Sequence, residues 1–176
     1  MCIDINLRFI TNPNISDFLN IVKYVNRNIE SNSFPRIATN KNIPSENAYK
    51  WLHKVNNNEQ IISIAKSGNI VVGVSHIDIF HGRRSHGGKL AMTVDNSYRS
   101  MGIGTRLMGS IINECKSSNI FWLRAEPTED NIPMIKILQK FDFSIEGRCK
   151  NAFLSDDGKY LDLVEYARLM GPLHVE

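Results

Sequence analysis

The segment from Val94 to Thr105 most restricts how this 176-residue chain can fold. The residues before it, Lys89–Val94, favour a strand, and the apolar residues after it follow helical spacing, at Leu107, Met108, Ile111, Ile112 and Cys115. Gly102 and Gly104 lie at the junction, and glycine lets a backbone approach a ligand closely. The start of a helix presents unpaired N–H groups and a partial positive charge. The junction is therefore a candidate phosphate site, with Arg99 as a further donor.

Two common nucleotide-binding patterns do not fit this junction. A dinucleotide fingerprint needs a third glycine where the chain has Leu107, and it should lie in an early strand-helix-strand unit. A P-loop needs four residues between its glycines and then Lys followed by Ser or Thr, and the segment Gly102-Ile103-Gly104-Thr105 has neither. A glycine-rich turn with no ligand is the remaining alternative. The two glycines alone do not decide between that turn and a phosphate site.

The rest of the chain alternates between strand-like and helix-like patterns. Strands are expected at residues 5–9, Gln60–Lys66, Ile70–Phe80, Lys89–Val94, Ile120–Glu126, Phe143–Cys149 and Tyr160–Leu169. Helices are expected after Asn14, Ser45, Gly104 and Asn131, and loops at residues 31–42 and His81–Gly88. This order implies a single domain over residues 1–176, with a mixed α/β sheet and helices on both of its faces.

Composition excludes several classes of protein. With 42% hydrophobic and 22% charged residues the chain can bury one sizeable core, and a net charge of +3 is too small to indicate a nucleic-acid partner. Cys2, Cys115 and Cys149 follow no zinc or disulfide spacing, so we expect no metal and a reducing cytoplasm. The chain shows no signal-peptide pattern and no apolar stretch near the ~18 residues of a membrane span, so we expect no membrane partner.

An Arg-x-x-Gly-x-Gly loop at 99–104 follows an expected strand that ends in Val. This loop is similar to the acetyl-coenzyme A loop of the GNAT family of N-acetyltransferases. Downstream, Asn131 and the segment Lys140–Phe143 resemble the family's Asn, apolar helix and Lys-Leu-Gly-Phe pattern. Residues 83–86, 145–148 and 157–162 resemble a branch that acts on free amino acids and other small amines. The resemblance covers residues 70–170.

The resemblance implies a fold and an activity. The fold is an α/β GNAT fold, with a mixed, mostly antiparallel central sheet of about seven strands flanked by about four helices. The activity is transfer of an acetyl group from acetyl-coenzyme A to the amine of a small molecule such as an amino acid, by direct attack on the thioester. A protein N-terminus or lysine as acceptor, and a non-catalytic acyl-coenzyme A sensor, are the alternatives. The final strands could also pair across a homodimer.

By the same resemblance, the backbone of Met92, Thr93 and Val94 pairs with the pantetheine arm of acetyl-coenzyme A like an added strand. The pyrophosphate lies on the N–H groups of the glycine junction. The residues expected to bind the cofactor are Met92, Thr93, Val94, Arg99, Ser100, Met101, Gly102, Ile103, Gly104, Thr105, Asn131 and Lys140.

Acetyl transfer needs a base that deprotonates the amine and donors that stabilise the oxyanion and the leaving thiolate. Glu126, at the end of an expected strand, is the first candidate base, and His86 is the second because histidine titrates near neutrality. Either could instead be a solvated surface residue. Asn131 caps its helix and could also hold a water or a cofactor amide. Many relatives place a tyrosine as general acid at the position of Leu138, so that role stays unassigned.

Overall fold

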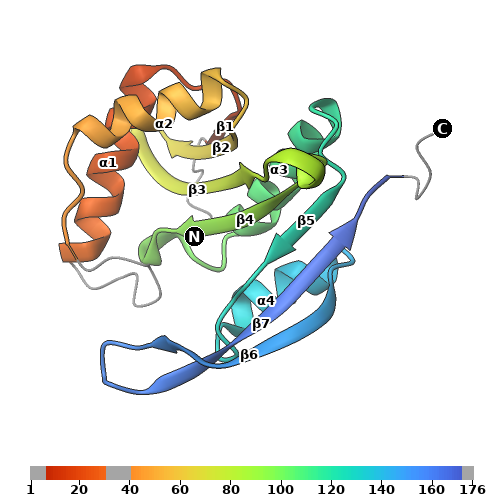
Figure 1. Cartoon of the computed structure of the whole chain (residues 1–176). Helices are drawn as coiled ribbons and strands as arrows, with labels where there is room; N and C mark the ends of the chain where they lie inside the picture. The colour runs from red at the N-terminus through yellow and green to blue at the C-terminus, as the bar shows by residue number, and fades with distance from the viewer. Residues whose placement is uncertain (1–6, 31–40, 172–176) are drawn as a thin grey trace.

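A computed structural model of the chain describes residues 7–30 and 41–171 (Figure 1). Its strands are β1 Leu7–Ile10, β2 Gln60–Ser67, β3 Ile70–Ile79, β4 Gly87–Val94, β5 Trp122–Ala125, β6 Ser144–Leu154 and β7 Tyr160–Leu169. Its α-helices are α1 Ile15–Glu30, α2 Glu46–Asn56, α3 Ile103–Ser117 and α4 Ile132–Lys140. The predicted order of strands and helices is confirmed. Residues 5–6 of the expected first strand and 31–40 of the expected loop lie outside the described residues.

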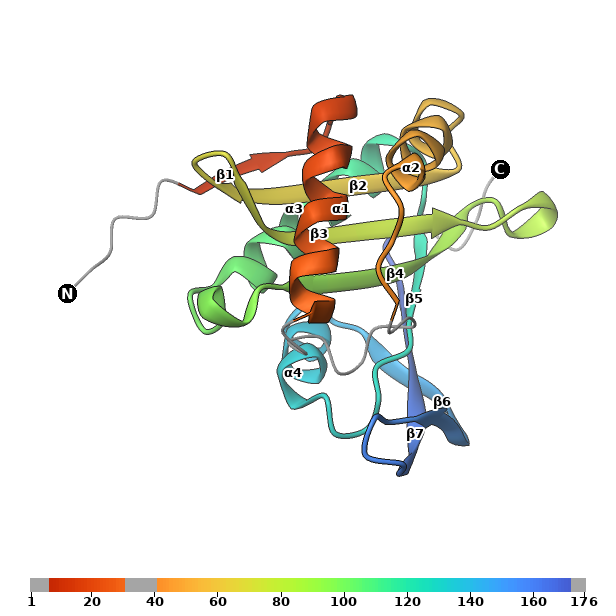
Figure 2. The same ribbon diagram turned by 90° about the vertical axis from the view of Figure 1, so that its left-hand side faces the viewer.

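The seven strands form one sheet in the order β1-β2-β3-β4-β5-β7-β6. Every neighbouring pair is antiparallel except β4 and β5, so the predicted mixed, mostly antiparallel fold class is confirmed. The parallel pair joins Gly87–Lys89 to Trp122–Arg124, after which the two strands diverge (Figure 2). The second half of β4 therefore has a free edge on the side of β5.

Helices cover both faces of the sheet. α1 crosses in front of β3 in Figure 2, beside α2, and α3 lies behind the sheet. The two faces carry separate cores, one around Phe18 and Ile64 and the other around Met108 and Ile111, and these side chains are fully buried. Burying an apolar side chain of this size stabilises the fold by about 1.5–3 kcal/mol. The apolar stripe of each helix thus holds it against its own face of the sheet.

The structure moves several of the expected boundaries. β6 continues past Cys149 to Leu154, because its end pairs with the start of β7 at Leu154 and Tyr160. β5 begins at Trp122 rather than Ile120, because the Ile120 amide donates to the carbonyl of Cys115 and completes the end of α3.

Candidate active site

The free edge of β4 presents backbone groups to the gap between β4 and β5. The amide of Asp95 donates to the carbonyl of Val72 on β3 at 2.9 Å, and backbone groups along a strand alternate between its two neighbours. The backbone groups of Met92 and Val94 therefore point toward the side of β5. Both residues come after Lys89, the last residue of β4 that pairs with β5. Arg99 Nε donates to the carbonyl of Val94 at 3.3 Å. The edge can hydrogen-bond an extended ligand that carries amides.

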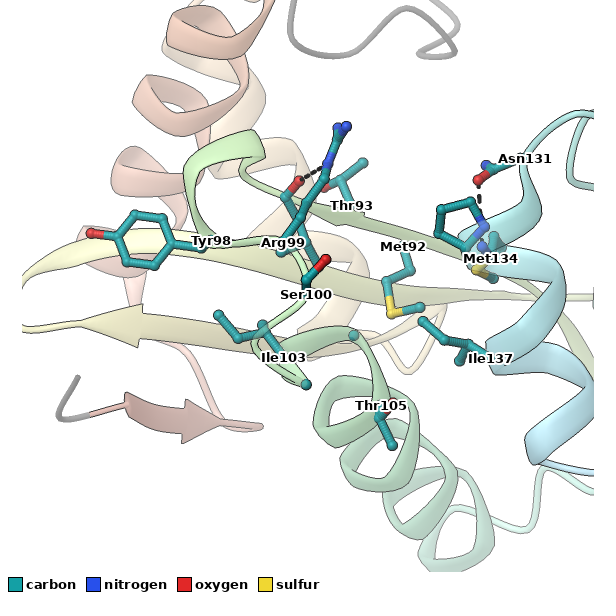
Figure 3. A pocket seen from close by; sticks show the side chains of 14 residues that line it. Met92, Thr93, Tyr98, Arg99, Ser100, Ile103, Thr105, Asn131, Met134 and Ile137 are labelled. Atoms are coloured by element: carbon teal, nitrogen blue, oxygen red, sulfur yellow. Dashed lines mark hydrogen bonds between the residues drawn. The ribbon is translucent and has the colours of Figure 1, made fainter. Parts of the chain in front are cut away.

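A cavity of about 460 Å³ lies beside this edge, between the start of α3 and α4 (Figure 3). It is lined by Met92, Thr93, Val94, Tyr98, Arg99, Ser100, Gly102, Ile103, Gly104, Thr105, Asn131, Pro133, Met134 and Ile137. Most of the residues expected to bind the cofactor thus surround one cavity. Sequence reasoning missed Tyr98, Pro133, Met134 and Ile137, although the spacing of Met134 and Ile137 on one helix could have indicated a shared face.

Two residues of the expected cofactor set do not line this cavity. Met101 is 45% exposed within the junction, because the loop turns its side chain to solvent. Lys140 is exposed at the end of α4, whereas the cavity is lined by Pro133, Met134 and Ile137 of that helix. Neither side chain lines the cavity. Cofactor binding by Lys140 and by the backbone N–H of Met101 stays a prediction.

The start of α3 supplies the polar end of the cavity. Gly102 caps the helix in the left-handed region, at φ 76°, and provides no side-chain hydrogen bond. The first N–H groups of the helix, from Ile103 onward, are thus left to a ligand. Gly104 faces α4 so closely that a Cβ atom there would lie 2.8 Å from Ile137 Cδ1. Uncapped N–H groups and the positive end of the helix dipole together suit a phosphate.

A second cavity of about 590 Å³ lies beneath α1 and α2 and extends to β6 and β7. Its apolar wall comprises Ile21, Val25, Ile43, Trp51, Ile62, Val74, Leu90, Ala91, Met92, Ala125, Pro127, Met134, Phe153 and Leu163. Its polar residues are Lys54, Gln60, His76, Asp78, Lys89, Thr93, Glu126, Thr128 and Asn131. Met92, Thr93, Asn131 and Met134 line both cavities, so the two spaces meet where β4 faces the start of α4.

Glu126 lies directly after β5 in the wall of the second cavity. Its side chain is 17% exposed, with Oε2 2.7 Å from Lys89 Nζ and Oε1 2.8 Å from Arg124. Arg124 also pairs with Glu165 on β7. These ion pairs hold a carboxylate at the point where β4 and β5 diverge.

Asp78 forms a second charged group farther along the cavity. His76 Nε2 lies 3.6 Å from one of its oxygens, and Gln60 Nε2 donates to the other at 2.9 Å. Lys54 Nζ lies 3.7 Å away. The interaction with His76 is the main cause that lowers the pKa of Asp78 to about 2, and partial burial opposes it. The cavity therefore offers paired positive and negative groups beside an apolar wall.

The other two predicted catalytic residues are Asn131 and His86, and of these only Asn131 lines the cavities. Asn131 caps α4, as expected, by accepting from the Met134 amide at 3.4 Å, and it lies where the cavities meet. His86 is exposed just before β4, and its carbonyl accepts from the amides of Phe121 and Trp122. It lines neither cavity, because it lies at the end of β4 opposite to the glycine junction, so a catalytic role of His86 stays a prediction that no contact in these cavities supports.

Leu138, at the position where many relatives have a tyrosine, is fully buried. It belongs to the buried core between α3, α4 and the sheet, which also contains Phe143 and Tyr166. It lines neither cavity, whereas the adjacent Ile137 lines the first. Position 138 thus serves packing, and a Leu side chain there cannot act as an acid.

In the described part of the chain, no helix is both long and apolar enough to cross a membrane. Over the same residues, no group of three or more His, Cys, Asp or Glu side chains is placed to hold a metal ion.

Comparison with known proteins identifies the family. Residues 26–143 match the acetyltransferase (GNAT) family. The L-amino acid N-acetyltransferase AaaT of Escherichia coli (strain K12) is 35% identical over 105 residues, which are 56% of this chain and 62% of that protein. The matched region therefore spans less than two thirds of this relative.

Solved structures show the same fold. A GNAT-family acetyltransferase from Streptococcus pneumoniae has a TM-score of 0.84 at 22% identity, covering 94% of this chain and 100% of that one. A phosphinothricin acetyltransferase from Sinorhizobium meliloti, solved with acetyl-coenzyme A, has a TM-score of 0.79 at 15% identity, covering 94% and 89%. Since the family pattern extends over well more than half of the chain, the protein belongs to the GNAT family of acetyltransferases.

Proposed function

We propose that this protein is an acetyl-coenzyme A-dependent N-acetyltransferase whose acceptor is the amine of a small molecule such as an amino acid. The proposal rests on one observation, which is that two cavities meet at Met92, Thr93, Asn131 and Met134. One cavity suits a donor with a phosphate end and the other suits an amine acceptor. A transferase needs both substrates to meet at one point.

The first cavity would hold acetyl-coenzyme A. The N–H groups at the start of α3 would receive the pyrophosphate, and the free edge at Met92 and Val94 would receive the pantetheine amides. The Sinorhizobium meliloti relative was solved with this ligand, which supports the assignment. When bound, the thioester supplies an activated acetyl carbon, which bonds to the amine nitrogen as the carbon–sulfur bond breaks and coenzyme A leaves.

The second cavity would hold the acceptor. Glu126 is the proposed base, since its carboxylate lies in the cavity wall and can take a proton from an ammonium group. Lys89 and Lys54 provide cations for the carboxylate of an amino acid, and the apolar wall under α1 and α2 receives its side chain. The Escherichia coli relative is named an L-amino acid N-acetyltransferase, which supports this acceptor class.

Asn131 is proposed to use its amide N–H groups at the point where the cavities meet. Its Oδ1 accepts from the Met134 amide at the start of α4, so the amide nitrogen is the part that can donate to a substrate or a water. We place the reaction in the cytoplasm, consistent with Cys115 and Cys149 being free thiols.

We further propose that two copies pair through β6, which is an edge strand of the sheet. Its Ile145 and Leu154 side chains are 62% and 59% exposed. An edge strand with exposed apolar residues readily pairs with another strand. Light scattering of the purified protein decides between one copy and two, and Ile145→Lys should shift a dimer to the monomer.

A panel assay tests the activity. The purified protein is mixed with acetyl-coenzyme A and amino acids, other small amines or peptides, and the released thiol is measured. Thiol release with amino acids supports the proposal. Release with peptides alone would identify a protein acetyltransferase. Binding of coenzyme A by calorimetry without release for any amine would identify a sensor.

A further inference from the structure

We propose that the Thr93 hydroxyl, oriented by the buried phenol of Tyr24, donates a hydrogen bond to the acetyl carbonyl oxygen of the donor. This inference rests on the proposed function, because it concerns the same thioester. Thr93 would be a catalytic residue, since it touches the reacting group. Tyr24 would be a positioning residue that acts through Thr93.

Thr93 lies where the two cavities meet, together with Met92, Asn131 and Met134 (Figure 3). Of these four side chains, those of Thr93 and Asn131 carry hydrogen-bond donors. We call the first cavity the donor cavity and the second the acceptor cavity. An acetyl group that passes from acetyl-coenzyme A in the donor cavity to an amine in the acceptor cavity must cross this place. The carbonyl oxygen therefore comes within reach of a Thr93 donor on β4.

The orientation of the Thr93 hydroxyl follows from its partner. Tyr24 on α1 is 1% exposed, and its phenol donates to Thr93 Oγ1 at 3.2 Å. Burial raises the pKa of the Tyr24 phenol, so the phenol stays neutral and keeps its proton for this bond. With its oxygen accepting from Tyr24, the Thr93 hydroxyl has its own proton left to donate into the cavity. A hydroxyl that accepts one hydrogen bond also donates a stronger one.

Further contacts fix α1 in place next to β4. Arg27, one turn after Tyr24, binds Asp95 at 2.8 Å and also donates to the Val71 carbonyl at 3.3 Å. Asp95 in turn accepts from the Ser97 amide at 3.0 Å. The helix is thus tied to β3 and to Asp95, which follows β4 two residues after Thr93, and these contacts hold the phenol beside the hydroxyl.

The chemical value of such a donor comes from the charge that forms during the reaction. As the amine attacks, negative charge grows on the carbonyl oxygen, and a donor already aimed at that atom stabilises the charge without reorganising. No proton is transferred from Thr93 or Tyr24 in this role. The hydrogen bond is stronger in the transition state than in the ground state, so its loss should lower kcat more than it raises KM.

The kinetic test uses Thr93→Val, Thr93→Ser, Tyr24→Phe and the double variant Tyr24→Phe with Thr93→Val. Thr93→Val should lower kcat about 10²-fold, as loss of one oxyanion donor does, with the affinity for acetyl-coenzyme A nearly unchanged. Thr93→Ser should keep most of the activity, and Tyr24→Phe should lower kcat about 10-fold through lost orientation. The double variant should match Thr93→Val, because Tyr24 acts only through Thr93.

Ser63→Ala is the control, since it removes a buried hydroxyl that binds Ser110 at 2.9 Å away from both cavities. It should lower stability without changing kcat. Wild-type kcat in a folded Thr93→Val protein overturns the proposal. Effects that multiply in the double variant also overturn it, since Tyr24 would then act independently of Thr93. If Thr93→Val does not fold, Tyr24→Phe and Thr93→Ser carry the test.

A spectroscopic test does not need turnover. The infrared carbonyl band of acetyl-coenzyme A, labelled with carbon-13 at the acetyl carbonyl, should move to lower frequency on binding to the wild type. Thr93→Val should move it back, Tyr24→Phe should move it partly back, and Ser63→Ala should leave it in place. An unchanged band in Thr93→Val overturns the proposal. A wild-type protein that shows the shift but acetylates no amine would instead refute the proposed function.

Discussion

Lys89 Nζ lies 2.7 Å from Glu126 Oε2, and this contact joins β4 to the end of β5 where the two strands diverge. Lys89 is the last residue of β4 that pairs with β5, opposite Arg124, which holds the other oxygen of Glu126 at 2.8 Å. The carboxylate is therefore fixed in the acceptor cavity by both strands. This is the carboxylate that we propose as the base for an acceptor ammonium.

Glu126→Gln should lower kcat about 10²-fold or more at neutral pH, because the base is removed while the shape of the side chain is kept. The affinity for acetyl-coenzyme A should stay close to that of the wild type, since Glu126 does not line the donor cavity. Steady-state kinetics and calorimetry measure the two effects. Glu129→Gln is the matched control, because Glu129 is exposed and binds Arg148 outside both cavities. A small loss that higher pH does not relieve would indicate a structural carboxylate.

Gly104→Val should weaken binding of coenzyme A by at least ~2 kcal/mol, comparable to the loss of charge-assisted hydrogen bonds. A Cβ atom at this position would already lie 2.8 Å from Ile137 Cδ1, so a branched side chain must fill the donor cavity or push α4 away. Calorimetry measures the affinity. Gly109→Ala is the control within α3, where a Cβ atom meets Phe141 at an ordinary 3.9 Å. Unchanged affinity in a folded Gly104→Val protein would refute the phosphate site.

Asp78→Asn should change how stability depends on pH. The pKa of Asp78 is lowered from 3.8 to about 2, so the folded state favours the ionised carboxylate. This contribution is complete above about pH 4 and is lost as the pH falls toward 2. The difference in unfolding free energy between the wild type and Asp78→Asn should therefore shrink over that range, and urea unfolding at pH 6 and pH 3 measures it. The effect should be small, because the side chain is 49% exposed and solvent screens it. A constant difference would show that these partners do not favour the ionised form.

Leu138→Tyr should lower stability without restoring a general acid. Leu138 is fully buried in the core, and a larger side chain there typically costs about 1–3 kcal/mol through overpacking. The phenol would have to displace core neighbours before it reached the donor cavity. Thermal unfolding should show a lower Tm, and single-turnover kinetics should show no faster transfer. A faster single turnover in a folded variant would mean that the helix can turn this position toward the leaving group.

Local patterns in the sequence predicted much of the fold, because they depend on residues close together in the chain. The helices after Asn14 and Asn131 were predicted from a capping residue followed by apolar residues at helical spacing. Both caps are present, with Asn14 Oδ1 accepting from the Ser16 amide at 2.9 Å and Asn131 accepting from Met134. Motifs spread along the chain were also sufficient to recognise the family, and the fold of that family then predicted the mixed, mostly antiparallel sheet.

The sequence by itself determined the order of the strands and helices and the place where a helix begins at a glycine-rich turn, since these properties are set by neighbouring residues. The tertiary structure alone decided which distant side chains meet. It brought Thr93 of β4 to Asn131 and Tyr24, placed Lys89 against Glu126, left His86 outside both cavities and buried Leu138 in the core. These outcomes depend on strand register and on the divergence of β4 from β5, which arise from pairing and packing between segments far apart in the chain.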